Sequence, residues 1–95
     1  MSGSRTSPLS PVKEAHTPIP LYGFLEGDTI GLLIVAEENE TVQGLAQKLQ
    51  DGARLRVAPW EKIQVIYKEK VLDPELTLLQ AGLEALERFD VIRGE

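Results

Sequence analysis

The stretch EKIQVIYKEKVLDPELTLLQAGLEALERFDVI, residues 61–92, decides the fold of this chain. Its residues 63–67 are a run of β-branched and aromatic side chains, which favours a β-strand. The polar residues 68–70 predict a turn, and the apolar residues 71–72 return the chain to the sheet. We therefore expect one strand, a tight turn and a short partner strand here.

The second part of the same stretch predicts a compact connection and a last strand. The residue before Pro74 is biased away from helix, so residues 73–74 mark a break. Residues 77–83 are too few and too interrupted for a full helix, but they place leucines in a core. Residues 89–92, with the sequence FDVI, have the composition of a final strand.

Length and composition limit the possible functions. The 95 residues make one domain with a thin core, because a domain this small buries only about 60% of its unfolded surface. The net charge of −5 argues against nucleic-acid binding, and no apolar run approaches the roughly 20 residues of a membrane span. The absence of cysteine excludes disulfides and favours a reducing, cytoplasmic compartment, and no secretory signal is visible.

Residues 1–18 differ in composition from the rest of the chain. All the serines of the chain and three of its prolines lie in this segment. Such a composition cannot bury enough apolar surface to offset its conformational entropy. We expect a disordered arm over residues 1–18 and a folded domain over residues 19–95, with a partner-docking segment as the alternative role of the arm.

The first folded segment has the pattern of a β-hairpin. Residues 21–25 predict a strand, residues 26–28 (EGD) predict a turn, and residues 30–36 predict the partner strand. Because side chains alternate along a strand, every second residue of this segment faces the core, and the residues between them, which include Leu33 and Val35, face the opposite side. Both sets are apolar, whereas a strand with one solvated face alternates between apolar and polar residues.

Residues 41–53 predict the main helix. Thr41 is a suitable N-cap, and the apolar residues after it recur at helical spacing, at Val42, Leu45, Leu49 and Ala53. Gly52 is the expected C-terminal stop, and Gly44 leaves room for close packing on the sheet. Trp60, beyond the helix, is expected to be a partly buried anchor at the edge of the domain, with a partner contact as the alternative.

These elements predict an α+β fold, in which one helix covers one face of a mixed sheet. The helix stripe then packs on a predicted core of nine sheet and loop residues: Ile30, Leu32, Ile34, Val65, Leu72, Leu78, Leu83, Phe89 and Val91. The opposite face of the sheet is left without a helix.

The folded part lacks the side chains of common catalytic sites. It contains no serine or cysteine, and the one histidine, His16, lies in the arm, so a Ser-His or Cys-His nucleophile cannot be built. The carboxylates, among them Glu84, Glu87 and Asp90, are expected on solvated faces. No spacing suggests a metal-binding loop or a phosphate-binding glycine loop. The sequence therefore predicts that the chain is not an enzyme by itself, holds no cofactor or metal, and acts by binding.

The uncovered sheet face is the predicted binding surface. In the pleat, Ile66 points away from the core-facing Val65, and Ile92 points away from Val91. Together with four residues of the hairpin they form an apolar partner-binding patch: Leu33, Val35, Ile66, Ile92, Tyr22 and Phe24. Strand propensity alone could also place apolar residues on this face, and the N-terminal arm could fold back over it.

Three pieces of the chain resemble ubiquitin: ETVQGLAQKL at the helix, VIYKEKVL at the third strand and TLLQAGL after it. On this resemblance Ile66 and Ile92 fall at two positions of the ubiquitin recognition patch, and the fold is a ubiquitin-like β-grasp. The ubiquitin pattern breaks where Arg93-Gly94-Glu95 stands in place of a diglycine, which weakens a role as a conjugated modifier.

A second resemblance covers residues 19–95. The pieces PLYGFLEGDTIGLLIVA, RLRVAP and LDPELTLLQAGL, with the last strand DVI, are similar to the small B (gamma) subunits of bacterial multicomponent toluene monooxygenases. This resemblance implies a non-catalytic accessory subunit of an aromatic-hydrocarbon hydroxylase. Its partner would be the large hydroxylase subunit that carries the diiron centre, and the isolated chain would be a monomer. The alternative is a free-standing ubiquitin-like interaction module or modifier.

Overall fold

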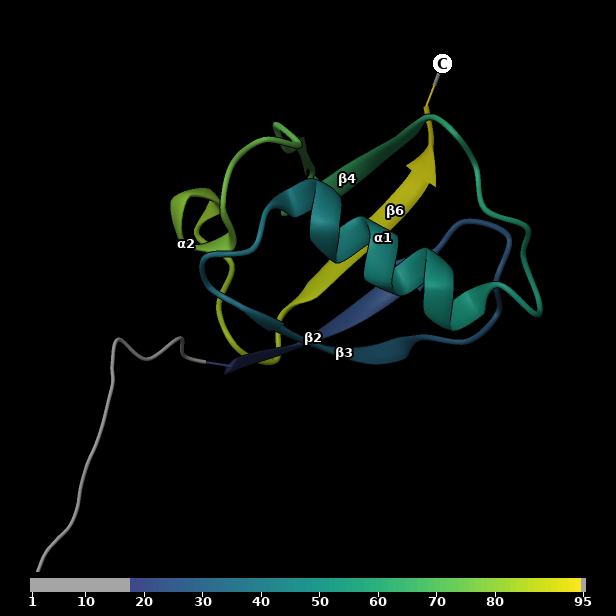
Figure 1. Cartoon of the computed structure of the whole chain (residues 1–95), viewed down its shortest axis with the longest axis horizontal. Coiled ribbons are helices and arrows are strands. Elements are labelled where there is room, and N and C mark those ends of the chain that lie inside the picture. The colour runs from purple at the N-terminus through teal and green to yellow at the C-terminus, as the bar shows by residue number, and fades with distance from the viewer. Residues whose placement is uncertain (1–17, 95) are drawn as a thin grey trace, which may run out of the picture.

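The computed structural model describes residues 18–94, and Figure 1 shows the helices and strands of this part. Its strands are β2 (Pro18–Leu25), β3 (Leu32–Glu37), β4 (Ile63–Tyr67), β5 (Lys70–Val71) and β6 (Arg88–Arg93). Its helices are α1 (Val42–Ala53) and α2 (Leu78–Ala81). Residues 1–17 of the predicted arm lie outside the described residues, and Pro18, assigned to the arm, instead opens β2.

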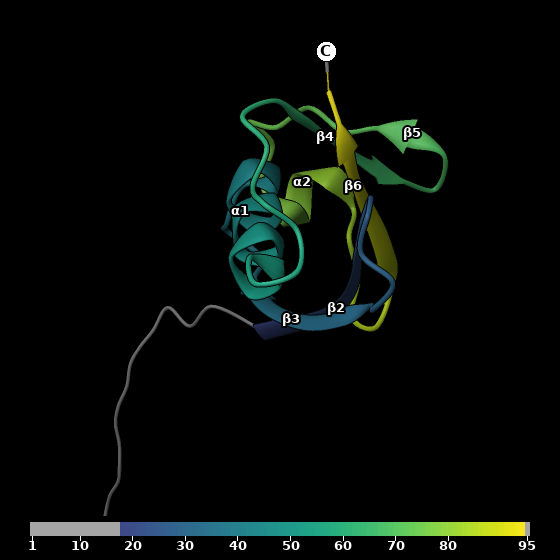
Figure 2. The same ribbon diagram turned by 90° about the vertical axis from the view of Figure 1, so that its right-hand side faces the viewer.

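The five strands form one mixed sheet in the order β3-β2-β6-β4-β5. The central strands β2 and β6 run parallel, and every other neighbouring pair is antiparallel. Figure 2 shows the sheet curving around α1, which lies against its concave face. The predicted α+β architecture of one main helix on a mixed sheet is confirmed.

The core lies between α1 and the concave face of the sheet. The predicted stripe of the helix is buried, with Val42, Leu45, Leu49 and Ala53 at most 1% exposed. Five of the nine predicted sheet and loop core residues are buried, and Leu32, Ile34 and Leu72 are partly buried and pack against them. Trp60 also packs on this core as a partly buried residue, as expected.

The prediction that Ile30 belongs to the core is wrong. Its side chain is 48% exposed, because the connection from β2 extends to Gly31 and β3 begins only at Leu32. Gly27 turns this connection with φ of +91°, a conformation that glycine adopts without the steric cost of a Cβ. Periodicity alone extended the second strand two residues too far.

Two expectations about the glycines of α1 are also corrected. Thr41 caps the helix as predicted, accepting a hydrogen bond from the Gly44 N–H at 3.0 Å. A Cβ at Gly44 would meet the Thr41 hydroxyl oxygen at 3.3 Å, so this glycine lies beside the cap and does not pack on the sheet. Gly52 lies inside the helix, which continues to Ala53, and a Cβ there would stand 3.1 Å from a methyl of Leu32.

The compact connection before β6 contains the four-residue helix α2. Thr77 and Gln80 form a reciprocal capping box, in which each side chain accepts a hydrogen bond from the other residue's backbone N–H. Gly82 ends this helix in the left-handed conformation, with φ of 81°. Strong caps at both ends explain why so short a segment is helical, which spacing alone did not predict.

Candidate protein-binding surface

The outer face is the sheet face turned away from α1, and strand alternation places all six predicted contact residues on it. Buried Leu21 and Leu25 in β2 leave Tyr22 and Phe24 pointing outward, and the same alternation turns Leu33 and Val35 of β3 away from the core. On the other half of the sheet, Ile66 and Ile92 point away from buried residues of β4 and β6.

Strand register shows which of these six residues are cross-strand neighbours. Tyr22 is the cross-strand neighbour of Leu33, and Pro20 is that of Val35, so the β2–β3 half presents one apolar group. These side chains are open to solvent, at 44% for Tyr22, 56% for Leu33 and 57% for Val35. In the other half Ile66 is partly buried and pairs with Val71, which is 59% exposed. All six residues thus lie on one face, and their role as a single contact patch stays a prediction.

Two charged residues of β6 also lie on the outer face. Arg88 is the neighbour of Tyr22, and Asp90 lies between Phe24 of β2 and Ile66 of β4. Arg88 Nε donates to Asp90 Oδ1 at 2.8 Å, and this hydrogen bond and charge raise the pKa of Arg88. Sequence reasoning missed this pair, although two opposite charges at i and i+2 of one strand necessarily share a face.

Phe24 is held on the outer face by contacts on both sides. The Arg88 guanidinium carbon lies 4.0 Å from the centre of its ring, which is a cation–π distance. A Cβ at Gly31 would stand only 2.5 Å from Phe24 Cε2, so the ring packs closely on the glycine backbone. The half-buried ring therefore supports the ion pair and leaves less of its own surface for a partner.

A shallow depression of about 450 Å³ lies beside the ion pair. Its lining includes Ile66, Lys68, Glu87 and Arg88, so an apolar wall meets charged groups of both signs. The carboxylate of Glu87 accepts a hydrogen bond from the buried Tyr67 hydroxyl and lies 3.6 Å from Lys68 Nζ. Glu87 is thus part of a structural network, and the expectation of a solvated carboxylate is wrong for it.

The charges in this network shift one another's ionisation. Burial and the bond to Glu87 raise the pKa of Tyr67, and the bond from Tyr67 lowers the pKa of Glu87. The hydrogen bond with Tyr67 and the nearby Glu87 charge raise the pKa of Lys68. Each shift keeps the phenol neutral and the two charged groups ionised, which suits a structural bond better than proton transfer.

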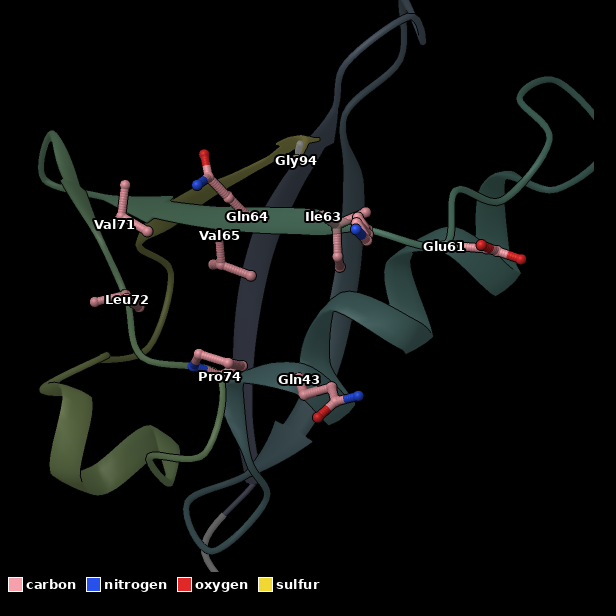
Figure 3. Close-up of a pocket in the computed structure, with 10 residues that line it drawn as sticks. Gln43, Glu61, Ile63, Gln64, Val65, Val71, Leu72, Pro74 and Gly94 are labelled. Atoms are coloured by element: carbon pink, nitrogen blue, oxygen red, sulfur yellow. The ribbon is translucent and has the colours of Figure 1, made fainter.

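A second depression, of about 430 Å³, lies on the other side of β4 and is shown in Figure 3. Ile63, Val65 and Leu72 form its apolar part, while Gln43 and Glu61 supply polar groups at its border. The lining has no histidine, serine or cysteine, and its charged residues, Glu61 and Lys62, are both exposed. Within residues 18–94 no three His, Cys, Asp or Glu side chains are grouped so that they could hold a metal ion.

The free edge of β3 is partly blocked by side chains of α1 and the loop before it. Lys48 Nζ donates to the carbonyl of Val35 at 3.1 Å, and a carboxylate oxygen of Glu40 accepts from the Glu37 N–H. Lys48 and Glu40 also form an ion pair at 2.9 Å. Charged side chains that occupy the hydrogen-bonding groups of an edge strand hinder its pairing with another strand. The exposed face of this hairpin is therefore better suited to a protein contact than its edge.

Among residues 18–94, neither helix has the length and apolar character needed to cross a membrane. A mixed sheet curved over one helix, with an open and partly apolar outer face, defines a small β-grasp domain. Residues 18–92 match the family model described as toluene-4-monooxygenase system protein B (TmoB). The chain therefore belongs to the TmoB family.

Several solved structures share this fold. One of them is a chain of a toluene 4-monooxygenase HD complex with the inhibitor 4-bromobenzoate. It superposes with a TM-score of 0.76 at 24% identity, and the match covers 82% of this chain and 100% of that one. The ubiquitin of Caldiarchaeum subterraneum gives a TM-score of 0.70 at 19% identity, covering 83% of this chain and 96% of that one.

The ubiquitin-like domain of Plasmodium falciparum Dsk2 gives a TM-score of 0.69 at 19% identity, covering 82% of this chain and 100% of that one. At these identities the likenesses establish the fold alone, and they confirm the expected ubiquitin-like β-grasp. A search of curated proteins gave no match.

Proposed function

We propose that this chain is a non-catalytic accessory subunit of a diiron aromatic-hydrocarbon monooxygenase hydroxylase. Its membership of the TmoB family carries the proposal, since that family is described as a component of a toluene-4-monooxygenase system. The likeness to a chain of a toluene 4-monooxygenase complex supports it. On this proposal the diiron centre and the oxidation belong to the large hydroxylase subunit, and the assembly is cytoplasmic.

The outer face is the proposed contact with the large subunit. Fully burying an aliphatic side chain contributes about 1.5–3 kcal/mol, so covering the exposed half of Leu33 or Val35 contributes about 1 kcal/mol each. The Arg88–Asp90 pair and the depression beside Ile66 supply polar groups that fix the orientation of a partner. Such a surface gives a specific contact while the isolated chain stays monomeric.

Co-purification of the full-length chain with the large hydroxylase subunit from the same cells tests this proposal. We expect a stable stoichiometric complex on gel filtration, and Leu33→Asp together with Ile66→Asp should weaken it at least tenfold. Leu79→Asp is the matched control, because Leu79 is 65% exposed but lies on α2, outside the sheet. Unchanged complex formation by the double variant would eliminate the outer face as the contact.

A free-standing ubiquitin-like interaction module is the second candidate, and the similarity to the ubiquitin of Caldiarchaeum subterraneum favours it. This candidate predicts reversible binding to several proteins, or covalent adducts visible by intact-mass spectrometry of cell extract. A single stoichiometric complex with an iron-containing subunit would decide against it.

A further inference from the structure

The loop after α1, residues 54–59, presents an unusually exposed leucine. This arginine loop has the sequence RLRVAP, and its Leu55 is 96% exposed, more than any other large apolar side chain of residues 18–94. The outer face does not include the loop, because the loop connects α1 to β4. A single exposed leucine is ordinary on a protein surface, so the loop's construction and charge must decide whether it has a role.

An ion pair fixes the loop to the β2–β3 connection. Arg56 forms a fork with Asp28, with Nε to Oδ1 at 3.0 Å, Nε to Oδ2 at 3.1 Å and Nη2 to Oδ2 at 3.0 Å. The Asp28 side chain is only 2% exposed, so its partner shields the carboxylate from water. Asp28 Oδ1 also accepts from the Ile30 N–H at 3.3 Å. Paired arginine–carboxylate bonds of this kind restrict geometry as well as adding energy.

Backbone and core contacts hold both ends of the loop. The N–H groups of Arg56 and Val57 both donate to the Ala53 carbonyl, at 2.8 and 2.9 Å, and Val57 packs against the core. At the exit, the Trp60 N–H donates to Gln50 Oε1 at 2.7 Å, and Gln50 is 4% exposed. The backbone that carries Leu55 is thus held in place, which lowers the entropic cost of ordering the loop on binding.

The charge of the loop is opposite to that of the molecule. The chain has a net charge of −5, yet residues 52–60 contain two arginines and no carboxylate. Arg56 is neutralised by Asp28, whereas Arg54 is exposed and forms no ion pair with any residue from 18 to 94. Among residues 18–94 the loop therefore offers an apolar side chain next to an arginine that has no ion-pair partner.

We propose that Leu55 inserts into an apolar socket with carboxylates at its rim on the large hydroxylase subunit. This inference rests on the proposed function and adds a second contact that is independent of the outer face. The Asp28–Arg56 pair holds the loop in place, Leu55 supplies the buried anchor, and Arg54 pairs with the rim. Small interfaces draw most of their affinity from a few such anchors.

Affinity of the full-length chain for the purified large subunit, measured by calorimetry, tests the inference. Leu55→Asp should weaken binding at least tenfold, and Leu55→Met should keep it within threefold because methionine retains an apolar anchor. Arg54→Glu should weaken binding severalfold and reduce its dependence on salt. Thermal unfolding of each variant should match the wild type, because both side chains are exposed.

The control variants separate the possible outcomes. Leu79→Asp changes another exposed leucine and should bind like the wild type; an equal loss with Leu79→Asp and Leu55→Asp would overturn the inference. If the wild type binds and Leu55→Asp binds equally well, Leu55 is not an anchor, while the proposed function stands. If the wild type shows no binding to the large subunit, the proposed function and this inference fail together.

Discussion

Replacing Tyr67 by phenylalanine tests whether the hydrogen bonds of its hydroxyl are a main source of the domain's stability. Tyr67 is 7% exposed, and its hydroxyl lies within hydrogen-bonding distance of the Glu87 carboxylate and the Gly82 carbonyl. This one group connects β4 with the loop that follows α2 and with the residue before β6. Tyr67→Phe removes the hydroxyl and leaves the ring, so packing is preserved and only the hydrogen bonds are lost.

The expected cost is about 1.5–2 kcal/mol. A hydrogen bond to a charged group contributes about 1.5–3 kcal/mol, and the low end applies here because Glu87 keeps other partners. Its carboxylate still accepts from the Glu84 N–H at 3.0 Å and stays near Lys68, and its side chain is 27% exposed to water. A domain of this size has only about 4–12 kcal/mol of stability, so the melting temperature should fall by roughly 6–15 °C.

Urea and thermal unfolding, followed by circular dichroism, measure this cost. Tyr22→Phe is the matched control, because Tyr22 is 44% exposed and its hydroxyl makes no hydrogen bond within residues 18–94, so its change should stay within about 0.5 kcal/mol. Equal costs for the two tyrosine variants would refute the reasoning. A cost for Tyr67→Phe below about 0.5 kcal/mol would refute it as well.

The pH dependence gives an independent check. The bond from Tyr67 is the largest cause of the lowered pKa of Glu87, whose ordinary value is 4.5. A lowered folded-state pKa contributes stability that is complete above the unfolded pKa and is lost as pH falls through the folded pKa. Tyr67→Phe removes that cause, so the difference between variant and wild type should narrow below about pH 4.5. A constant difference from pH 7 to pH 3 would contradict the assignment.

Two further predictions concern packing and capping. Gly23→Ala should destabilise the domain by about 1–3 kcal/mol in urea unfolding. A Cβ there would stand 2.7 Å from Phe89 Cζ and 3.0 Å from a Leu49 methyl. An unchanged midpoint of urea unfolding would show that the core relaxes freely. Thr77→Ala should cost about 1 kcal/mol by the same measurement, since it removes the hydroxyl that accepts from the Gln80 N–H at 3.1 Å. A neutral Thr77→Ala would show that the Gly82 cap alone maintains α2.

The sequence was informative wherever one element determines its own structure. The Thr41 cap, the helical stripe and the strand pattern of residues 63–67 depend on neighbours within a few positions, so local rules predicted them. The Tyr67–Glu87 bond joins residues 20 positions apart and depends on the path of the chain through α2, which no local pattern encodes. Ile30 was misplaced for a similar reason, because its environment follows from the length of a hairpin connection.

For the outer face too, local rules predicted the direction of each side chain but not the order of the strands. Alternation correctly oriented Leu33 and Ile66, because the pleat determines direction within each strand. It could not show which strands lie between them, and these are β2 and β6, of which β6 carries Arg88 and Asp90.

Stability does not explain why a charged pair occupies the middle of a largely apolar face. An exposed ion pair contributes only about 0–1 kcal/mol to folding, and Arg88 and Asp90 are 62% and 37% exposed. In the isolated chain the pair interrupts the apolar surface, which limits self-association. In the proposed complex it would lie within the contact, where a mismatched partner leaves both charges desolvated and unpaired. We therefore propose that the pair selects the partner more than it supports the fold.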